Sequence, residues 1–571
     1  MSASNDFYKV LVKDSRLNCR STLGYAVFKG GMNVTNQPFN AQSWNPSSVN
    51  HTIQVPSETT LIDRRFLWEN QITLRLVGTP AVGEYLVNYG VKDAFGPFPM
   101  QQMCLTTNCT INSNTISQNT QDIISIILRL NNPRDLQRYN GMTPTAYDTY
   151  YKYSDAVNAN NNPNGSWVNV SDNDLLPRGS YTLESISGNS IGDGNPKTVD
   201  VVIKVTEPIL MSPFLFGEAK SNGQAMYGIQ NMSFNFTLTN GGSTSRVWRT
   251  SSTLTSATVT SIEQPVLRVT FLSPHPSDLF PSRNVVAYYE LPRYTLQLPA
   301  VVNAGATADL TSNNLQLNQI PDKVIIGARK KMTNQTWNDS DSWLPIEGTS
   351  INFNNQSGIL SSADVHQLYQ MSVANGSNQN WLEFRGKANV PFSGNTLPDV
   401  ATSGSLLVLA FGKDIQLVND YEAPGCIGNY NFQYKLTVRN NTGAEINSTT
   451  HEVITILLNS GLMVFDRGTS SKFTAILSKV DVLEASEQKP YFMDTIQRKV
   501  GSGFFDMLKS AASVLLPKLR ESIRGSDNKL LGAVDKGLSK LGLGHSGGMG
   551  PSGGAGPSGG RMSLRDRIMN R

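Results

Sequence analysis

Two segments of this 571-residue sequence, 198 residues apart, carry the same pattern. The first is "GIQNMSFNFTLTN" (228–240) and the second is "CIGNYNFQYKLTVRN" (426–440). The alignment pairs Ile229 with Ile427, Asn231 with Asn429, Phe234 with Phe432, Phe236 with Tyr434, Leu238 with Leu436 and Thr239 with Thr437. An internal repeat restricts the fold to architectures in which one structural unit occurs twice.

The repeated segment has the periodicity of a half-buried strand. Phe234, Phe236 and Leu238 fall on one face of an extended chain, and the polar residues between them fall on the other. Any two amphipathic strands share such alternation. The common Ile-x-Asn lead-in and an upstream Phe-Gly, at 216–217 and 411–412, favour a true repeat.

Short apolar runs separated by Asn, Gly, Ser and Pro continue from about residue 61 to 465, which is the spacing of strands and turns. The clearest runs are 71–78, 199–206, 233–240, 265–272, 323–331, 406–412, 432–438 and 453–459. The chain is longer than the roughly 250–300 residues that one hydrophobic core can serve. We therefore expect two β-sandwiches of the jelly-roll type, which pair two sheets face to face.

Two segments depart from strand periodicity and predict helices. They are "TISQNTQDIISIILRLNN" (115–132) and "GILSSADVHQLYQMSVANG" (358–376), and each places Ser or Thr before an apolar stretch that ends at Asn-Asn or Asn-Gly. One such segment falls in each half of the chain. The predicted fold class is thus all-β, a tandem (double) jelly roll with short inserted helices.

The domain boundaries follow from this spacing. We expect an N-terminal arm and jelly roll in residues 1–245, a second jelly roll in residues 246–490, and a separate tail in residues 491–571. The tail holds 13 Lys and Arg against 6 Asp and Glu, whereas residues 1–490 hold 35 against 38. The positive excess of the chain therefore lies in its tail.

The tail pattern predicts an amphipathic helix, a Gly-rich linker (542–560) and a basic end. Pro517 is expected to kink or split that helix. The residues expected on its apolar face are Phe504, Leu508, Leu515, Leu519 and Ile523. The basic end carries Arg561, Arg565, Arg567 and Arg571.

Three interpretations of the tail stay open. The apolar face is suited to lying in a membrane interface. The four arginines on a flexible linker are suited to neutralising the phosphates of a nucleic acid. In the third interpretation the helix packs against the protein and the arginines are solvated.

No sequence motif indicates catalysis. The five histidines are scattered without metal-ligand spacing, and neither a nucleophile elbow nor a phosphate-binding loop is present. The four cysteines, Cys19, Cys104, Cys109 and Cys426, also lack zinc spacing, so we expect free, mostly buried thiols. We predict no catalytic residue, no metal and no cofactor.

The beginning of the sequence indicates where the chain works. The first 19 residues contain no apolar segment of a secretory leader, and the sequence has no run of about 20 apolar residues. We expect an intracellular product in a reducing compartment.

Four segments resemble the double-jelly-roll major capsid proteins of the lineage that includes virophages, polinton-like viruses and related small icosahedral viruses. They are "LIDRRFLWENQITLRL" (61–76), "LPRGSYTL" (176–183), "IPDKVIIGARKK" (320–331) and "GCIGNYNFQYKLTVRN" (425–440). The resemblance implies a homotrimer that forms a pseudo-hexagonal capsomer in the shell of an icosahedral virion. It also implies contacts with penton or minor capsid proteins.

A second class of protein fits the same composition. Carbohydrate-binding or carbohydrate-cleaving β-sandwiches are also rich in Asn and aromatic residues, and a glycosidase needs a pair of carboxylates in a cleft. We therefore expect either a capsid protein or, as the alternative, a carbohydrate-recognising sandwich.

Overall fold

The computed structural model describes residues 32–131, 147–152, 181–214, 225–239, 244–276, 280, 283–389, 399–440, 450–475 and 477–487. The chain separates into two units, Met1–Thr495 and Ile496–Arg571, and all described residues belong to the first. The expected N-terminal arm up to residue 31 and the tail residues Phe504 to Arg571 lie outside the described residues.

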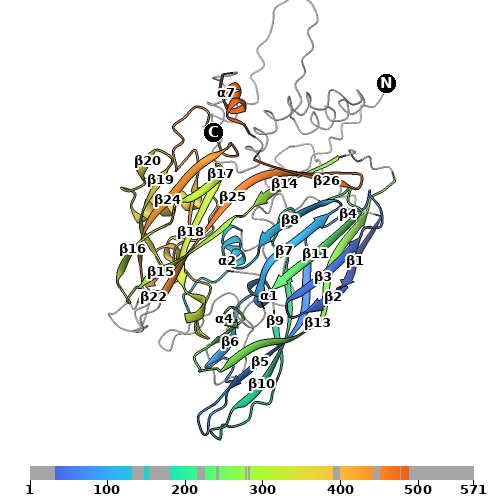
Figure 1. The fold of residues 1–571 in the computed structure, drawn as a ribbon, viewed down its shortest axis with the longest axis vertical. Coiled ribbons are helices and arrows are strands. Elements are labelled where there is room, and N and C mark those ends of the chain that lie inside the picture. The colour runs from blue at the N-terminus through green and yellow to red at the C-terminus, as the bar shows by residue number, and fades with distance from the viewer. Residues whose placement is uncertain are drawn as a thin grey trace, which may run out of the picture. The chain divides into compact units, whose positions relative to one another are not determined.

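The first sandwich consists of two antiparallel sheets packed face to face (Figure 1). One has the order β1 (Asn33–Asn40), β13 (Ser256–Ser273), β5 (Leu67–Gly78), β10 (Lys197–Pro208) and β9 (Tyr181–Ser187), with the short β4 (Leu61–Ile62) beside β13. The other has the order β2 (Ser43–Asn45), β3 (Ser48–Gln54), β11 (Asn231–Leu238), β7 (Cys104–Ile111) and β8 (Asn114–Asn119). Trp68 of the first sheet stacks on Phe236 of the second, with ring centroids 3.9 Å apart.

The second sandwich is built in the same way from later strands. Its first sheet has the order β14 (Arg283–Glu290), β25 (Thr450–Asp466), β18 (Lys323–Lys330) and β23 (Leu407–Ala410), with β15 (Arg293–Val301) and β26 (Thr469–Thr474) also paired to β25. Its second sheet contains β16 (Thr307–Thr311), β17 (Leu315–Gln319), β24 (Ile427–Arg439), β19 (Ile346–Phe353) and β20 (Gln356–Ile359).

Both sandwiches have jelly-roll topology. When the principal strands of each sandwich are counted along the chain, one sheet joins the first, eighth, third and sixth strands, and the other joins the second, seventh, fourth and fifth. The sheet β1-β13-β5-β10 thus corresponds to β14-β25-β18-β23, and β3-β11-β7-β8 corresponds to β16/β17-β24-β19-β20. The predicted fold class, a tandem jelly roll, is confirmed.

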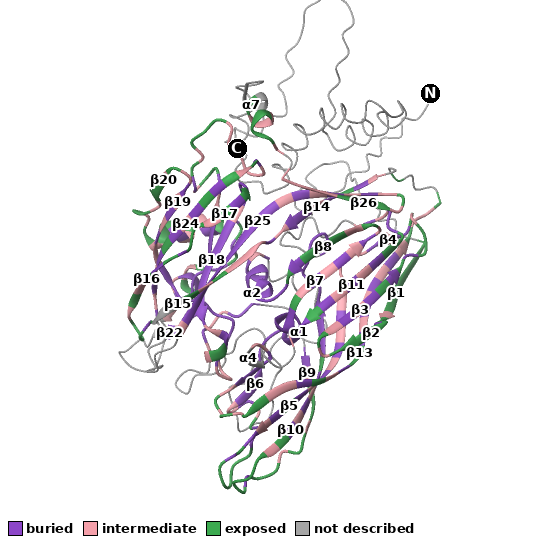
Figure 2. Cartoon of the chain, in the orientation of Figure 1, coloured by how far each residue is buried: buried purple, intermediate pink, exposed green. Residues whose placement is uncertain are grey.

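The sequence repeat coincides with equivalent strands. Its two copies form β11 and β24, the seventh strand of each sandwich. Every second residue of these strands is buried, as the alternating colours along them show (Figure 2). The aromatic and leucine side chains of the repeat face the cores: Phe234, Phe236 and Leu238 in the first and Phe432, Tyr434 and Leu436 in the second.

Short helices lie in the connections between strands, and one more, α7, follows the last strand β26. They are α1 (Pro99–Met103), α2 (Ile123–Ile127), α4 (Thr244–Val247), α5 (Val365–Ala374), α6 (Trp381–Phe384) and α7 (Lys479–Glu487), with 3-10 turns η2 (Leu128–Leu130) and η5 (Met332–Asn334). Two small two-stranded sheets join β6 (Asp93–Phe95) to β12 (Trp248–Thr250) and β21 (Lys387–Asn389) to β22 (Asp399–Ala401).

The two predicted helical segments fall in the same connection, between the fifth and sixth strands of each sandwich. The prediction over 358–376 is met by α5, which begins after a capping box formed by Asp364 and Gln367. The prediction over 115–132 is wrong at its start, because residues 114–119 form β8. Ile116 and Gln118 alternate into the interior there, and the whole segment pairs with β7, so the strand ladder overrides the helix signal.

Strand pairing favours a later division between the sandwiches than residue 245. The strand β13 runs from Ser256 to Ser273 and pairs with β1 and β5 of the first sandwich. The strand β14 starts at Arg283 and pairs with β25 of the second. We propose that the first jelly roll ends after Ser273, since a boundary at 245 separates its eighth strand from the sheet.

The repeated strand gives a stability prediction. Replacing Phe234 with Ala removes a ring that is 1% exposed and contacts Phe66 and Phe214, so the free energy of unfolding should fall by about 3–5 kcal/mol. Chemical denaturation of the full chain measures this. The control is Thr237→Ala on the exposed face of the same strand, expected within about 0.5 kcal/mol of the wild type. Equal effects of both substitutions would contradict the assigned faces.

Candidate functional site

The helix α2 belongs to neither sandwich core. All five of its residues, Ile123–Ile127, are buried, yet they lie outside both core clusters. The same holds for apolar residues on the outer face of the second sandwich's first sheet, Ile325, Val408, Ile454 and Ile456. We call this layer, with the charged residues around it, the junction between the sandwiches.

Asp122, the residue before α2, is the electrostatic centre of the junction. Its side chain is 1% exposed and pairs with Arg246 of the first sandwich at 2.6 Å, and with Arg293 and Arg329 of the second. Burial alone would raise the pKa of the Asp122 carboxyl, but the positive charges of Arg329, Arg246 and Arg293 hold it well below its ordinary range. Asp122 is therefore ionised in the folded chain.

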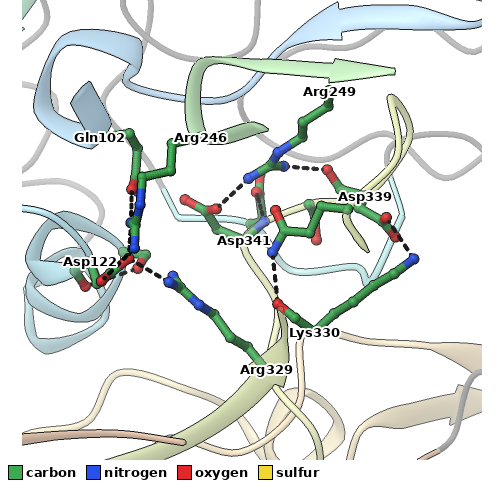
Figure 3. Close-up of polar contacts among 12 residues, drawn as sticks. Gln102, Asp122, Arg246, Arg249, Arg329, Lys330, Asp339 and Asp341 are labelled. Carbon is green, nitrogen blue, oxygen red and sulfur yellow. Dashed lines mark hydrogen bonds and ion pairs between the residues drawn. The ribbon is translucent and has the colours of Figure 1, made fainter. Parts of the chain in front are cut away.

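Arg329 links this carboxylate to a second one. Its Nε donates to Glu452 at 2.8 Å across the β18–β25 ladder, while its Nη2 donates to Asp122. Burial alone would lower the pKa of Arg329, because it disfavours the charged guanidinium. The carboxylates of Asp122 and Glu452 outweigh this effect and raise the pKa above its ordinary value. Figure 3 shows Arg246 and Arg329 reaching Asp122 from different elements.

The first sandwich also forms hydrogen bonds to the loop that follows η5. Arg249 of β12, with a fully buried side chain, donates to the Asp341 carboxylate at 3.1 Å and to the Asp339 carbonyl at 2.5 Å (Figure 3). The Asp339 carboxylate accepts from Lys330 at 3.0 Å. Arg129 of η2 donates to the backbone carbonyl of Asp341. The loop is thus held from both sandwiches at once.

A glycine and a tryptophan shape the face that receives these groups. A Cβ at Gly327 of β18 would lie 2.4 Å from the Trp343 ring, so only glycine lets this ring lie against the outer side of the strand. The guanidinium of Arg329 lies over the same ring, 5.9 Å from its centroid. The packing orients Arg329 towards Asp122.

The first sandwich supports the junction through a buried acid. Glu207 at the end of β10 accepts the backbone N–H groups of Met100 and Gln101 at 3.0 and 2.8 Å, which anchors the start of α1. The helix α1 contacts α4, which carries Arg246 and also contacts η5 of the second sandwich. Burial raises the pKa of the Glu207 carboxyl to about 8, although both N–H groups favour its ionised form.

The arrangement is structural in character. Within the described ranges there is no cluster of three metal-ligating side chains, and no helix there is long and apolar enough to cross a membrane. Four buried carboxylates of the junction are each paired with an arginine or a lysine: those of Asp122, Asp339, Asp341 and Glu452. The junction can hold two domains in one fixed arrangement.

The predicted residues are placed as follows. Cys104, Cys109 and Cys426 are buried free thiols, as expected, and Cys19 lies outside the described residues. The apolar and arginine sets of the tail also lie outside them, so both stay predictions.

The sequence analysis did not predict the junction. A local signal was "GARKK" (327–331), where charged residues continue an apolar strand that is buried from Val324 to Lys330.

Comparison with known proteins assigns relatives to both halves. Residues 5–273 match the family model of the Sputnik virophage major capsid protein first domain, and residues 291–461 match the model of the major capsid protein V20 C-terminal domain. The putative capsid protein V20 of Sputnik virophage is 29% identical over 522 residues, which cover 88% of this chain and 85% of the relative.

Solved structures agree with these matches. The cryo-EM structure of the Sputnik virophage at 3.5 Å resolution superposes with a TM-score of 0.68 and 28% identity, covering 87% of this chain and 99% of that one. The mavirus major capsid protein superposes with a TM-score of 0.61 at 13% identity, covering 86% and 99%, and this likeness concerns the fold alone.

The ion pairs of the junction predict that replacing one carboxylate with an amide lowers the stability of the chain strongly. Asp122→Asn keeps the shape of the side chain but leaves three arginines without their shared carboxylate, so the free energy of unfolding should fall by about 3–5 kcal/mol. Chemical denaturation measures it. Asp200→Asn is the control, since Asp200 pairs with Arg75 on the surface and should contribute about 0–1 kcal/mol. A loss at Asp122 as small as that at Asp200 would show that the junction does not hold the sandwiches.

Glu207 predicts a pH dependence of opposite sign to that of an ordinary ion pair. Between about pH 4.3 and 8 the folded chain keeps a proton that the unfolded chain has released, so the free energy of unfolding should fall as the pH rises through this window. Glu207→Gln should flatten the profile there. Glu263→Gln, an exposed acid on β13, should leave it unchanged. A wild-type profile that is level or rises over this window would refute the assignment.

Proposed function

The chain belongs to the virophage major capsid protein family, and from this membership we propose that three copies form a pseudo-hexagonal capsomer. As a member of that family it is a structural protein of the virion, and it builds an icosahedral capsid with copies of itself. Its relatives are capsid proteins and not enzymes, so neither catalysis nor carbohydrate cleavage is proposed.

The observation that carries the capsomer proposal is the pair of like sandwiches joined by a buried ionic layer. Two units of one topology, held in a fixed arrangement, give three copies six similar blocks around one axis. Such a capsomer suits a lattice position with six neighbours. A capsomer of six blocks does not match a vertex that has five neighbours. We therefore also propose that a penton or minor capsid protein fills the vertices.

We propose the division at residues 274–282 as the border between the two blocks. Two independent observations support it: β13 pairs within the first sandwich, and the two family matches end at residue 273 and begin at residue 291. The tail from residue 491 is a third part with a separate role.

For the tail we propose a contact inside the virion. The arginines Arg561, Arg565, Arg567 and Arg571 carry the charge that a packaged genome attracts. The apolar set Phe504, Leu508, Leu515, Leu519 and Ile523 suits a membrane interface. Packing of the same set against the sandwiches is the third outcome of the test below.

Expression of the full chain and of a variant ending at residue 490 tests assembly and tail together. Electron microscopy should show closed shells or uniform trimers for both, because the sandwiches carry the contacts between copies. Monomers of the full chain at all concentrations, retained on a glycan column, would instead support the carbohydrate alternative and refute the capsomer.

The tail proposal has its own readouts on the same particles. Replacing the four terminal arginines with Gln should abolish nucleic-acid binding that otherwise weakens roughly 50- to 150-fold between 50 and 200 mM salt. Replacing Leu508, Leu515 and Leu519 with Ser should abolish binding to anionic liposomes if the membrane contact is correct. Tails that bind neither partner would leave packing against the sandwiches as the role of the tail.

A further inference from the structure

The strands β1, β2 and β3 lie at the edges of the two sheets of the first sandwich. β1 is the end strand of one sheet, and β2 is the end strand of the other, with β3 next to it. Figure 1 shows the three strands along one side of the first sandwich. Residues 33–38 of β1 are exposed, although the strand pairs with β13 over eight residues. Strands with few buried side chains open at a lower free energy than the strands inside a sheet. We call residues 33–54 the edge segment.

The side chain of His51 joins the two parts of the edge segment. His51 belongs to β3 and is 1% exposed, and its Nδ1 lies 3.1 Å from the backbone carbonyl oxygen of Phe39 in β1. A carbonyl oxygen only accepts, so Nδ1 carries the proton and donates it. The hydrogen bond therefore connects a strand of one sheet to a strand of the other.

The second ring nitrogen of His51 is enclosed by the protein. Its Nε2 is buried and has no hydrogen-bond partner within the part of the chain that the structure describes. The ring packs edge-on against Phe236, with ring centroids 6.1 Å apart. A neutral imidazole leaves Nε2 without a proton, whereas an imidazolium would place a second N–H and a positive charge in this apolar layer. The site therefore suits the neutral ring and disfavours the charged one.

The internal repeat provides an equivalent position in the second sandwich. His51 lies opposite Phe234 of β11, and the residue that lies opposite Phe432 of β24 is Leu315. Leu315 packs against the second core with a side chain that cannot take up a proton. The fold thus accommodates leucine at this position, and the first sandwich has a titratable group there.

The surroundings of His51 supply no charge that could balance a protonated ring. The core-facing side chains of β1, β3, β5, β11 and β13 are uncharged. A titratable group in the same layer is the thiol of Cys109, which lies opposite Phe234 on β7, and burial raises its pKa, so it stays neutral. The charged pair Glu69 and Arg268 is on the outer side of the sheet.

Proton uptake by His51 is coupled to opening of the edge segment. Burial lowers the pKa of His51 to about 4, and the hydrogen bond to Phe39 offsets this effect only in part. When the edge segment opens into water, the ring regains its ordinary pKa of about 6.5. Between these two values the open segment binds a proton that the closed segment does not bind, so a falling pH favours opening.

We propose that His51 is an acid-sensitive switch of the first sandwich, which keeps the edge segment closed while its ring is neutral and releases it when the ring is protonated. The switch goes beyond the capsid function, because it gives the shell protein a place where acid opens one sandwich locally. The junction should stay closed at the same pH. The pKa of the Asp122 carboxyl is held well below its ordinary range, so this group is still ionised there.

Buried carboxyls have the opposite effect on the chain as a whole. Burial raises the pKa of Glu207 to about 8 and that of Asp322 to about 6, so both groups bind protons more readily in the folded chain. Falling pH thus favours global folding at these two groups and disfavours it at His51. Opening of the edge segment leaves Glu207, in β10, and Asp322, next to β18, in place. A local measurement is therefore needed to isolate His51.

Hydrogen exchange of the full chain, followed by mass spectrometry of its peptides, provides this measurement. The opening equilibrium of residues 33–54, corrected for the intrinsic exchange rate at each pH, should rise roughly 50- to 100-fold between about pH 7.5 and about pH 4.5. Residues 307–319 are the equivalent segment of the second sandwich. They should show no such rise, because Leu315 takes the place of the histidine.

Two variants at one position remove the titrating group. His51→Leu introduces the residue of the second sandwich, and His51→Gln keeps a donor for the Phe39 carbonyl without a titrating ring. In both variants the opening equilibrium of residues 33–54 should stay within about threefold over the same pH range. The matched control is His366→Gln, an exposed histidine of α5, which should keep the rise of the wild type.

Three results would overturn the switch. The first is an edge segment of the wild type whose opening does not change over this pH range. The second is a rise that persists in both His51 variants, because the proton would then bind elsewhere, for example at His451, the buried histidine of β25. The third is an equal rise in residues 33–54 and 307–319, since the response would then belong to both sandwiches.

Discussion

The structure depends on one buried carboxylate whose charge is neutralised by arginines from both sandwiches. Asp122 has no contact with water to stabilise its charge, and its three arginines come from α4, β15 and β18. An ion buried in this way is costly unless every partner is in place. Because Arg246 belongs to one sandwich while Arg293 and Arg329 belong to the other, the charges are balanced only when the two sandwiches occupy one relative arrangement. The layer therefore specifies the arrangement more than it adds stability.

The same fold serves two different purposes in the two halves of the chain. In the second sandwich the outer side of β18 is an interior surface, with Gly327 and Trp343 closing the space around Arg329. In the first sandwich the equivalent side is a polar ladder with Arg75 paired to Asp200 and Arg268 paired to Glu69. Equal topology thus does not imply equal surfaces, since each face is matched to what covers it.

The sequence predicts the strands well because their signal is local. All eight short apolar runs coincide with strands, five of them over their whole length, and the repeat marks the seventh strand in each sandwich. The error at 115–119 is also local: Thr and Ser before an apolar stretch predict a helix start, whereas pairing with β7 makes these residues a strand. The junction was beyond prediction because Asp122 meets Arg293 and Arg329 over separations of 171 and 207 residues. Nothing in the residues near each charge indicates its partner.

The junction differs from the half-exposed outer side of β5 and β13 in when it is closed off from water. The junction forms as the chain folds, so its two sides never meet the solvent in the native protein, and charges such as Asp122 and Arg249 can be fully buried there. A face that stays in water must keep the chain soluble. The ion pairs on the outer side of β13 and β5 are accordingly partly exposed, such as Arg268 with Glu69, and large exposed apolar residues beside them, such as Val34 of β1, are few. Exposed single apolar residues on a polar sheet are compatible with solubility, whereas a wide apolar patch is not. A surface that is closed during folding can therefore be ionic and fully buried, whereas a surface that stays in water is polar and carries few apolar side chains.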